Sequence, residues 1–159
     1  MCRCVVHRRS VLGMLAAAPL LAGCKPQTEG PEKIRYGREV CEICGMIISD
    51  PLYASEVRGG PDQRLVKFDD IGDAVHWLEM QPWKEDSGIE FWVMNSENGT
   101  DWMDARASYY LTGVVSPMDY GYAAIPAYEH GAVDFATMKA AVLEKGISSR
   151  CLPPEESDT

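Results

Sequence analysis

The sequence lacks several features that would each define a class of protein. Its main apolar run, residues 11–21, is shorter than the roughly 20 helical residues that cross a bilayer. The residue directly after Cys44 is Gly45 and not histidine, which excludes a CxxCH haem attachment at Cys41 and Cys44. No second CxxC pair completes a structural zinc site. After Cys24 there are 24 acidic but only 12 basic side chains, a net charge of about −12 that argues against nucleic-acid partners.

The first 23 residues have the composition of an export signal. Residues 1–9 carry three arginines and no acid, and the apolar run that follows ends in small residues. The pair Arg8 and Arg9 fits either a twin-arginine signal or ordinary basic charge. Residues 1–23 are therefore predicted to be removed on export.

The letters "LAGC" at the end of this signal resemble the lipobox of bacterial lipoproteins. That resemblance implies cleavage before Cys24 and lipidation of its sulfur, which anchors a protein stably when several acyl chains are attached. The alternative is an ordinary signal peptide with a chance cysteine. The expected location is the periplasmic side of a bacterial membrane, and Lys25 favours the outer membrane because it is not the aspartate that retains some lipoproteins at the inner one.

The remaining chain is predicted to form one α+β domain between two polar segments. Residues 24–31 form a lipid-anchored linker and residues 153–159 a disordered acidic tail. The domain between them, 32–152, divides into two halves at about 40–99 and 100–148. Once Cys24 is lipidated, three cysteines remain in the mature chain: Cys41, Cys44 and Cys151. This number is odd, so at least one thiol is free or bound to another group.

The first half is predicted to have the element order strand, strand, helix, strand. Strands are expected at 53–58, with alternating faces, and at 63–68, joined by the turn "GGPD", and a third at 89–95. Asp69 or Asp70 can cap the helix between them, which Pro82 ends. Its apolar residues recur at helical spacing: Ile71, Ala74, Val75 and Leu78.

The second half is predicted to repeat this order less regularly. One strand is expected around Trp102 and another at 122–125. A helix at 134–145 would bury Phe135, Met138 and Val142 and end at Gly146. The order predicts two tandem ββαβ-like units.

The CxxC pair is poorly placed for redox catalysis or zinc. A thioredoxin-like dithiol needs a helix that starts at the motif, but the following "GMIISDP" is unsuited to a helix. His76 in the first helix and His130 in a loop have no ligand spacing to a partner, so zinc is poorly supported.

Met46 is the residue that distinguishes the stretch. Cys44 and Met46 place a thiolate and a thioether two residues apart, and Gly45 between them lets both sulfurs reach one atom. This soft donor pair selects Cu(I). The alternative is that Met46 begins the apolar run "MII" and packs in the core.

Four segments together are similar to the NosL family of periplasmic copper-binding lipoproteins: "CGMIISDPLYASEV", "VKFDDIGDAVHWL", "WMDARASYY" and "SPMDYGYAAI". The resemblance implies a copper chaperone that delivers Cu(I) to nitrous oxide reductase beside a membrane ABC-type complex. It also implies a fold of two ββαβ-like units, related to the fold of the organomercurial lyase MerB.

The resemblance further implies the metal ligands. The motif cysteine and methionine are Cys44 and Met46, and Met118 in "SPMDYG" is a third candidate, expected to be exposed in a turn. Cys41 could join the site, with a smaller contribution than Cys44, or form a disulfide with it.

Two other classes of protein stay open. One is a thiol-disulfide oxidoreductase or lyase that uses Cys41 and Cys44, with Asp50 or Asp69 as an acid or base. The other is a structural lipoprotein in which the two cysteines form a disulfide. The interpretation as a Cu(I) chaperone predicts that the protein is not an enzyme.

Overall fold

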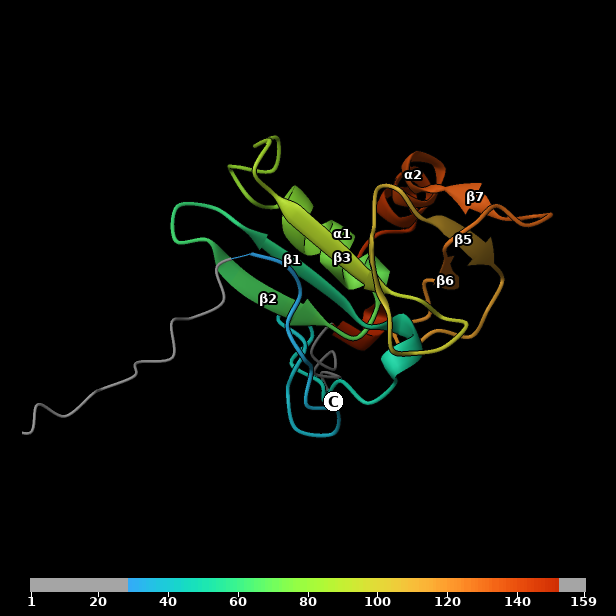
Figure 1. Cartoon of the computed structure of the whole chain (residues 1–159), viewed down its shortest axis with the longest axis horizontal. Helices are drawn as coiled ribbons and strands as arrows, with labels where there is room; N and C mark the ends of the chain where they lie inside the picture. Colours follow the sequence, from blue (N-terminus) through green and yellow to red (C-terminus); the bar gives the residue numbers. More distant parts are fainter. Residues whose placement is uncertain (1–28, 152–159) are drawn as a thin grey trace, which may run out of the picture.

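A computed structural model of the chain describes residues 29–151 (Figure 1). The predicted signal sequence, the lipidation site Cys24 and the tail at 153–159 lie outside the described residues. The elements in order are η1 (Pro51–Tyr53), β1 (Ser55–Gly59), β2 (Arg64–Phe68), α1 (Ile71–Glu79), β3 (Glu90–Met94), β4 (Trp102–Asp104), β5 (Tyr109–Thr112), β6 (Tyr122–Ile125), β7 (Val133–Asp134), α2 (Phe135–Lys145) and η2 (Ser149–Cys151). Two helices and two antiparallel sheets confirm the α+β class.

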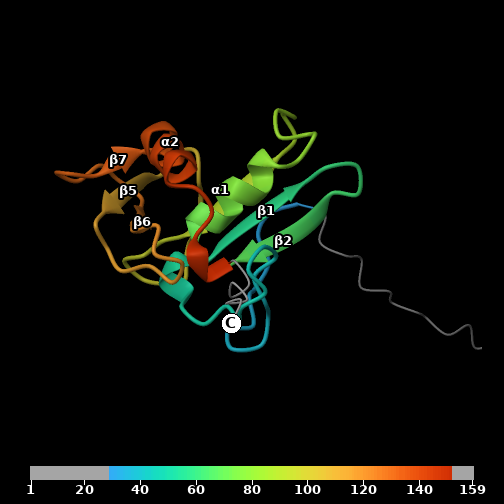
Figure 2. The ribbon, with the colours of Figure 1, turned by 180° about the vertical axis from the view of Figure 1, so that it is seen from behind.

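The larger sheet has the strand order β2-β1-β3-β4, so β1 is an internal strand. The side chains of this strand were predicted to alternate between two faces, and both faces are covered, because every residue of β1 is buried. Helix α1 packs on one face. On the other face, Glu32 donates its backbone N–H to the carboxylate of Glu56, and at the edge strand β2 Glu42 donates its own to the carbonyl of Lys67. The N-terminal segment thus covers the face of β1 that carries Glu56, and Figure 2 shows the opposite face, where α1 lies in front of the sheet.

Helix α1 begins where the sequence predicted, with Asp70 rather than Asp69 as its cap. The Asp70 carboxylate accepts from the N–H of Gly72 at 3.0 Å. Its other oxygen accepts from the hydroxyl of Ser116 at 2.6 Å and the N–H of Met118 at 3.1 Å. This fully buried carboxylate therefore ties the start of α1 to a loop more than forty residues away.

The second sheet differs from the predicted repeat. Its order is β6-β5-β7, and all three strands precede α2. The strand around Trp102, assigned from the sequence to the second half, is β4 and pairs with β3 in the first sheet. The reason is the tight turn after β3, in which Gly99 donates to the carbonyl of Asn95 at 2.8 Å and folds the chain straight back. The tandem ββαβ arrangement is therefore not confirmed.

Helix α2 follows its predicted pattern and joins the two halves. Asp134 caps it through the N–H of Thr137, and Gly146 follows its last turn at φ +79°. Met138 and Val142 are buried, whereas Phe135 is half-buried and its ring meets the edge of Phe91 from β3 at 5.7 Å between centroids. A single core cluster includes residues from both sheets and both helices: Phe68, Val75, Phe91, Tyr110, Met118, Met138 and Val142.

Glu56 is a buried carboxyl in the middle of β1. One of its oxygens accepts from the N–H of Glu32 at 2.8 Å, and the other has no hydrogen-bond partner among the described residues. Burial raises the pKa of Glu56 from 4.5 to about 7, despite the nearby cations Lys67 and Arg58. Because the folded-state pKa is the higher one, the stability linked to this group is present below pH 4.5 and is lost as the pH rises through 7.

The variant Glu56→Gln is therefore expected to be more stable than the parent at pH 8, by roughly 2 kcal/mol, and nearly equal to it at pH 5. Urea unfolding at the two pH values measures the difference. Glu97→Gln, at an exposed position, is the control and should leave the pH dependence unchanged. An equal gain or loss at both pH values would mean that Glu56 does not titrate with folding.

Candidate metal centre

The CxxC motif lies in a tight hairpin that its backbone hydrogen bonds close. Cys41 donates its N–H to the carbonyl of Met46 at 2.8 Å, and Gly45 donates to the carbonyl of Cys41 at 3.0 Å. Gly45 has φ +70°, a left-handed conformation that favours glycine. Val40 and Ile47 form an isolated bridge beyond the motif. The turn places both cysteines on a rigid loop, and no helix starts there.

The two thiols are free and differ in exposure. Cys41 is 1% exposed, whereas Cys44 is half-buried. They are not joined by a disulfide in this structure. One thiol is therefore enclosed by the core while the other reaches the surface, which is an asymmetry that the motif itself does not reveal.

The start of α1 brings two carboxylates to these thiols. Cys41 Sγ donates to Asp73 Oδ2 at 3.2 Å, and Cys44 Sγ lies 4.0 Å from Asp69 Oδ1. One donor atom from each of the four residues lies within 4.8 Å of all the others. Cys41, Cys44, Asp69 and Asp73 therefore form a group that could hold a metal ion.

Burial sets the protonation of the group. It raises the pKa of the Cys41 thiol far above its ordinary value, and that of Cys44 to about 12. Burial and the neighbouring Asp73 and Asp70 raise the pKa of Asp69 to about 6. Both thiols are consequently protonated at neutral pH, and a metal ion that binds there must displace their protons.

The two predicted methionine ligands differ in how far their side chains are exposed. Met46 follows the hairpin turn and is 39% exposed, so it does not pack in the core as the alternative interpretation had it. Met118 was expected to be exposed in its turn, but its side chain is completely buried in the core. The cause is the hydrogen bond from its N–H to the buried Asp70, which draws this loop inward. The expected exposure, which favoured Met118 as a ligand, is therefore absent. Copper binding by Met118 stays a prediction.

Sequence reasoning missed Asp73 and assigned Asp69 only to capping or to acid–base chemistry. The two residues are four apart in the sequence, with Asp69 just before the cap of α1 and Asp73 in its first turn. Such a pair on an otherwise apolar segment is a signal that could have been used. The group contains no histidine; the ring of His76 lies against Tyr120, with 5.7 Å between centroids.

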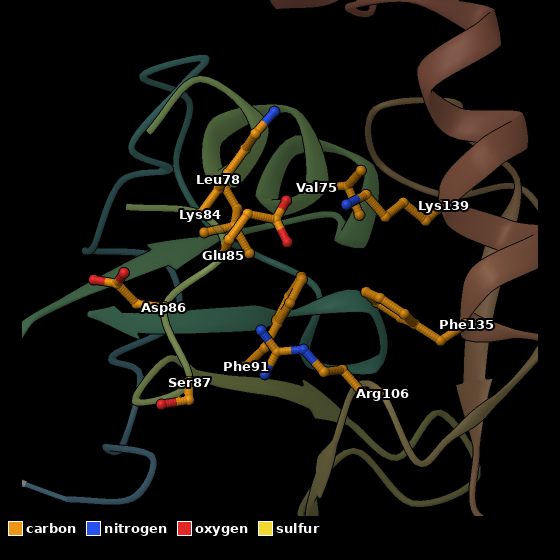
Figure 3. A pocket seen from close by; sticks show the side chains of 10 residues that line it. All are labelled: Val75, Leu78, Lys84, Glu85, Asp86, Ser87, Phe91, Arg106, Phe135 and Lys139. Carbon is orange, nitrogen blue, oxygen red and sulfur yellow. The ribbon is translucent and has the colours of Figure 1, made fainter. Parts of the chain in front are cut away.

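A separate cavity of about 320 Å³ lies between α1, α2 and the loop after α1 (Figure 3). Its floor is apolar, and there the rings of Phe91 and Phe135 meet edge to face. Lys84 and Lys139 at its rim both form ion pairs with Glu79. The cavity shares no residue with the group formed by Cys41, Cys44, Asp69 and Asp73, and no cysteine or histidine lines it. That group is therefore the better candidate for a metal site.

Comparison with models of protein families and with curated proteins returns no match for this chain. Neither helix between residues 29 and 151 is long and apolar enough to cross a membrane.

Proposed function

We propose that the protein binds Cu(I) through Cys41 and Cys44 and delivers it to a copper enzyme on the periplasmic side of a bacterial membrane. The observation that carries this proposal is the pair of free thiols held close together by one hairpin. Two thiolates are a soft donor set, which selects Cu(I) over harder ions. In this proposal Cys41 is a full copper ligand, which is a larger role than the sequence suggested.

The exposure of the site suits a carrier rather than a permanent cofactor site. Cys44 is half-buried, so an incoming ligand from a recipient protein can approach the metal from that side. Met46 is exposed next to it and offers a thioether as a further soft donor. Val40 and Ile47 of the same hairpin are also exposed, at 55% and 54%. They add an apolar surface on which a recipient could dock.

The remaining parts of the proposal come from the resemblance to the NosL family. They are nitrous oxide reductase as the recipient, a membrane ABC-type complex as partner, and a lipid anchor at Cys24. The family's two ββαβ-like units belong here as well; the first half, with the order β1, β2, α1 and β3, supports this idea.

The thiols are less suited to enzymatic redox chemistry. A reactive cysteine needs a thiolate at neutral pH, whereas burial raises the pKa of Cys41 and Cys44 well above that range. We therefore propose that the protein is a carrier and not a thiol-disulfide oxidoreductase. A purely structural disulfide stays the second alternative, and in this structure the two thiols are free.

An anaerobic titration of the reduced protein with Cu(I) against a coloured chelator tests the proposal. We expect one tightly bound ion per chain. Met46→Leu is expected to weaken binding about tenfold, because leucine keeps the apolar volume but cannot donate to copper.

Met80→Leu is the matched control, since Met80 is also exposed but follows helix α1, away from the hairpin in sequence. It should bind like the parent. Failure of the reduced parent to bind Cu(I) would contradict the proposed function, and unchanged binding by Met46→Leu would remove that residue from the ligand set.

A further inference from the structure

We infer that Asp69 and Asp73 complete a second mode of metal binding, in which the Cys2Asp2 group holds zinc(II) at the thiols that would otherwise bind Cu(I). This inference shares the thiols with the proposed function but does not depend on copper binding. It rests on four side chains that come from two separate segments, the hairpin at 40–47 and residues 69–73, which lead into the first turn of α1.

The positions of the donor atoms are close to those of a tetrahedral site. With zinc–sulfur bonds of about 2.3 Å and zinc–oxygen bonds of about 2.0–2.2 Å, the edges of such a tetrahedron are roughly 3.3–3.8 Å long. The contact between Cys41 Sγ and Asp73 Oδ2 is already 3.2 Å, and that between Cys44 Sγ and Asp69 Oδ1 is 4.0 Å. The largest separation in the group is below 4.8 Å, so an ion needs to draw the widest pair together by only about 1 Å.

The charge of the group favours a divalent ion. Asp69 and Asp73 are 3% and 0% exposed, and Cys41 is 1% exposed. None of the ion pairs among residues 29–151 includes Asp69. Two thiolates and two carboxylates carry four negative charges, of which zinc(II) offsets two and Cu(I) only one. In a buried site this difference is worth more than in water, because the effective dielectric constant is lower.

The donor types favour zinc as well. Zinc is of intermediate softness and takes cysteine sulfur and aspartate oxygen together, usually in a tetrahedron of four ligands. Carboxylate oxygens are hard donors that add little to the binding of Cu(I). The two ions should therefore use the same thiols but differ in their need for Asp69 and Asp73. As either ion binds, each thiol gives its proton to the solvent, with no change of oxidation state.

The double variant Asp69→Asn/Asp73→Asn tests this inference, because asparagine keeps the shape and removes the anionic donor. Zinc(II) affinity is measured in the reduced protein by competition with a coloured chelator, and Cu(I) affinity in a parallel anaerobic titration. We expect the double variant to lose zinc affinity about a hundredfold and Cu(I) affinity less than about threefold. Asp62→Asn/Asp86→Asn changes the net charge equally at exposed positions and should retain both affinities.

Cobalt(II) substitution in the parent provides a second measurement that requires no variant to fold. Intense visible bands of tetrahedral cobalt together with thiolate charge-transfer bands are expected. A weak, octahedral spectrum, or zinc binding equal in the parent and the double variant, would overturn the inference. Zinc binding without Cu(I) binding would support it while contradicting the proposed function.

Discussion

Cys41→Ser and Cys44→Ser are each expected to weaken Cu(I) binding by about a hundredfold or more, which corresponds to about 3 kcal/mol. A serine hydroxyl is a hard donor that does not replace a thiolate on copper. The sequence alone predicted a smaller loss for Cys41. The structure changes that expectation, because the hairpin holds both sulfurs in one group with Asp69 and Asp73.

The measurement is the same anaerobic chelator competition, with both variants and the parent compared at one pH. Thermal unfolding of the metal-free proteins is the control, since Cys41 is buried and its Sγ donates to Asp73. The serine hydroxyl can still donate there, so only a modest loss of stability, about 1 kcal/mol, is expected. If Cys41→Ser bound Cu(I) as the parent does, copper would be held by Cys44 and Met46 without the second thiol.

Gly72→Ala is expected to destabilise the protein by about 3 kcal/mol or more, for a steric reason. A Cβ atom at Gly72 would lie 2.1 Å from Cγ and 2.2 Å from Cδ2 of the Tyr120 ring. Tyr120 cannot move away easily, because it is buried, its hydroxyl accepts from the N–H of Ser148 at 3.0 Å, and its ring lies against His76. The helix must therefore shift, and Asp69 and Asp73 would shift with it.

Urea unfolding of the metal-free protein measures the change in the free energy of unfolding. In a thermal unfolding experiment the melting temperature should fall by about 10 °C. Gly88→Ala is the matched control, because no atom lies within 4 Å of the Cβ that it would add. It should leave stability nearly unchanged. Zinc affinity of Gly72→Ala, measured well below its melting temperature, should also fall. A fully stable Gly72→Ala variant would show that the contact between Gly72 and Tyr120 adapts at little cost.

The local elements could be predicted because their signals are local. Helix α1 follows from the apolar spacing after Ile71 and from a capping aspartate, and α2 from the stripe that ends before Gly146. Strands β1 to β3 follow from short β-rich runs between turn residues. Each of these signals lies within a few neighbouring residues, although the pairing of β1 with β3 joins segments more than thirty residues apart.

The partners of these elements were less predictable. The membership of β4 in the first sheet depends on the geometry of one turn, and the burial of both faces of β1 depends on a segment more than twenty residues earlier. The burial of Met118 depends on Asp70, 48 positions away. None of these contacts leaves a periodic pattern in the sequence, because each joins two segments that are distant along the chain.

The sequence by itself determined the α+β class, an aspartate cap for α1 and the glycine that ends α2, and it identified the cysteines as the residues to examine. Only the tertiary structure decided which cysteine is enclosed, that Met118 is core, and that Asp69 and Asp73 meet the thiols. The physical reason is that the enclosed thiol and Asp73 are 32 positions apart and are brought together by the packing of α1 on the larger sheet beside the N-terminal hairpin. A metal site of this kind is a property of packing, whereas its individual ligands are properties of the sequence.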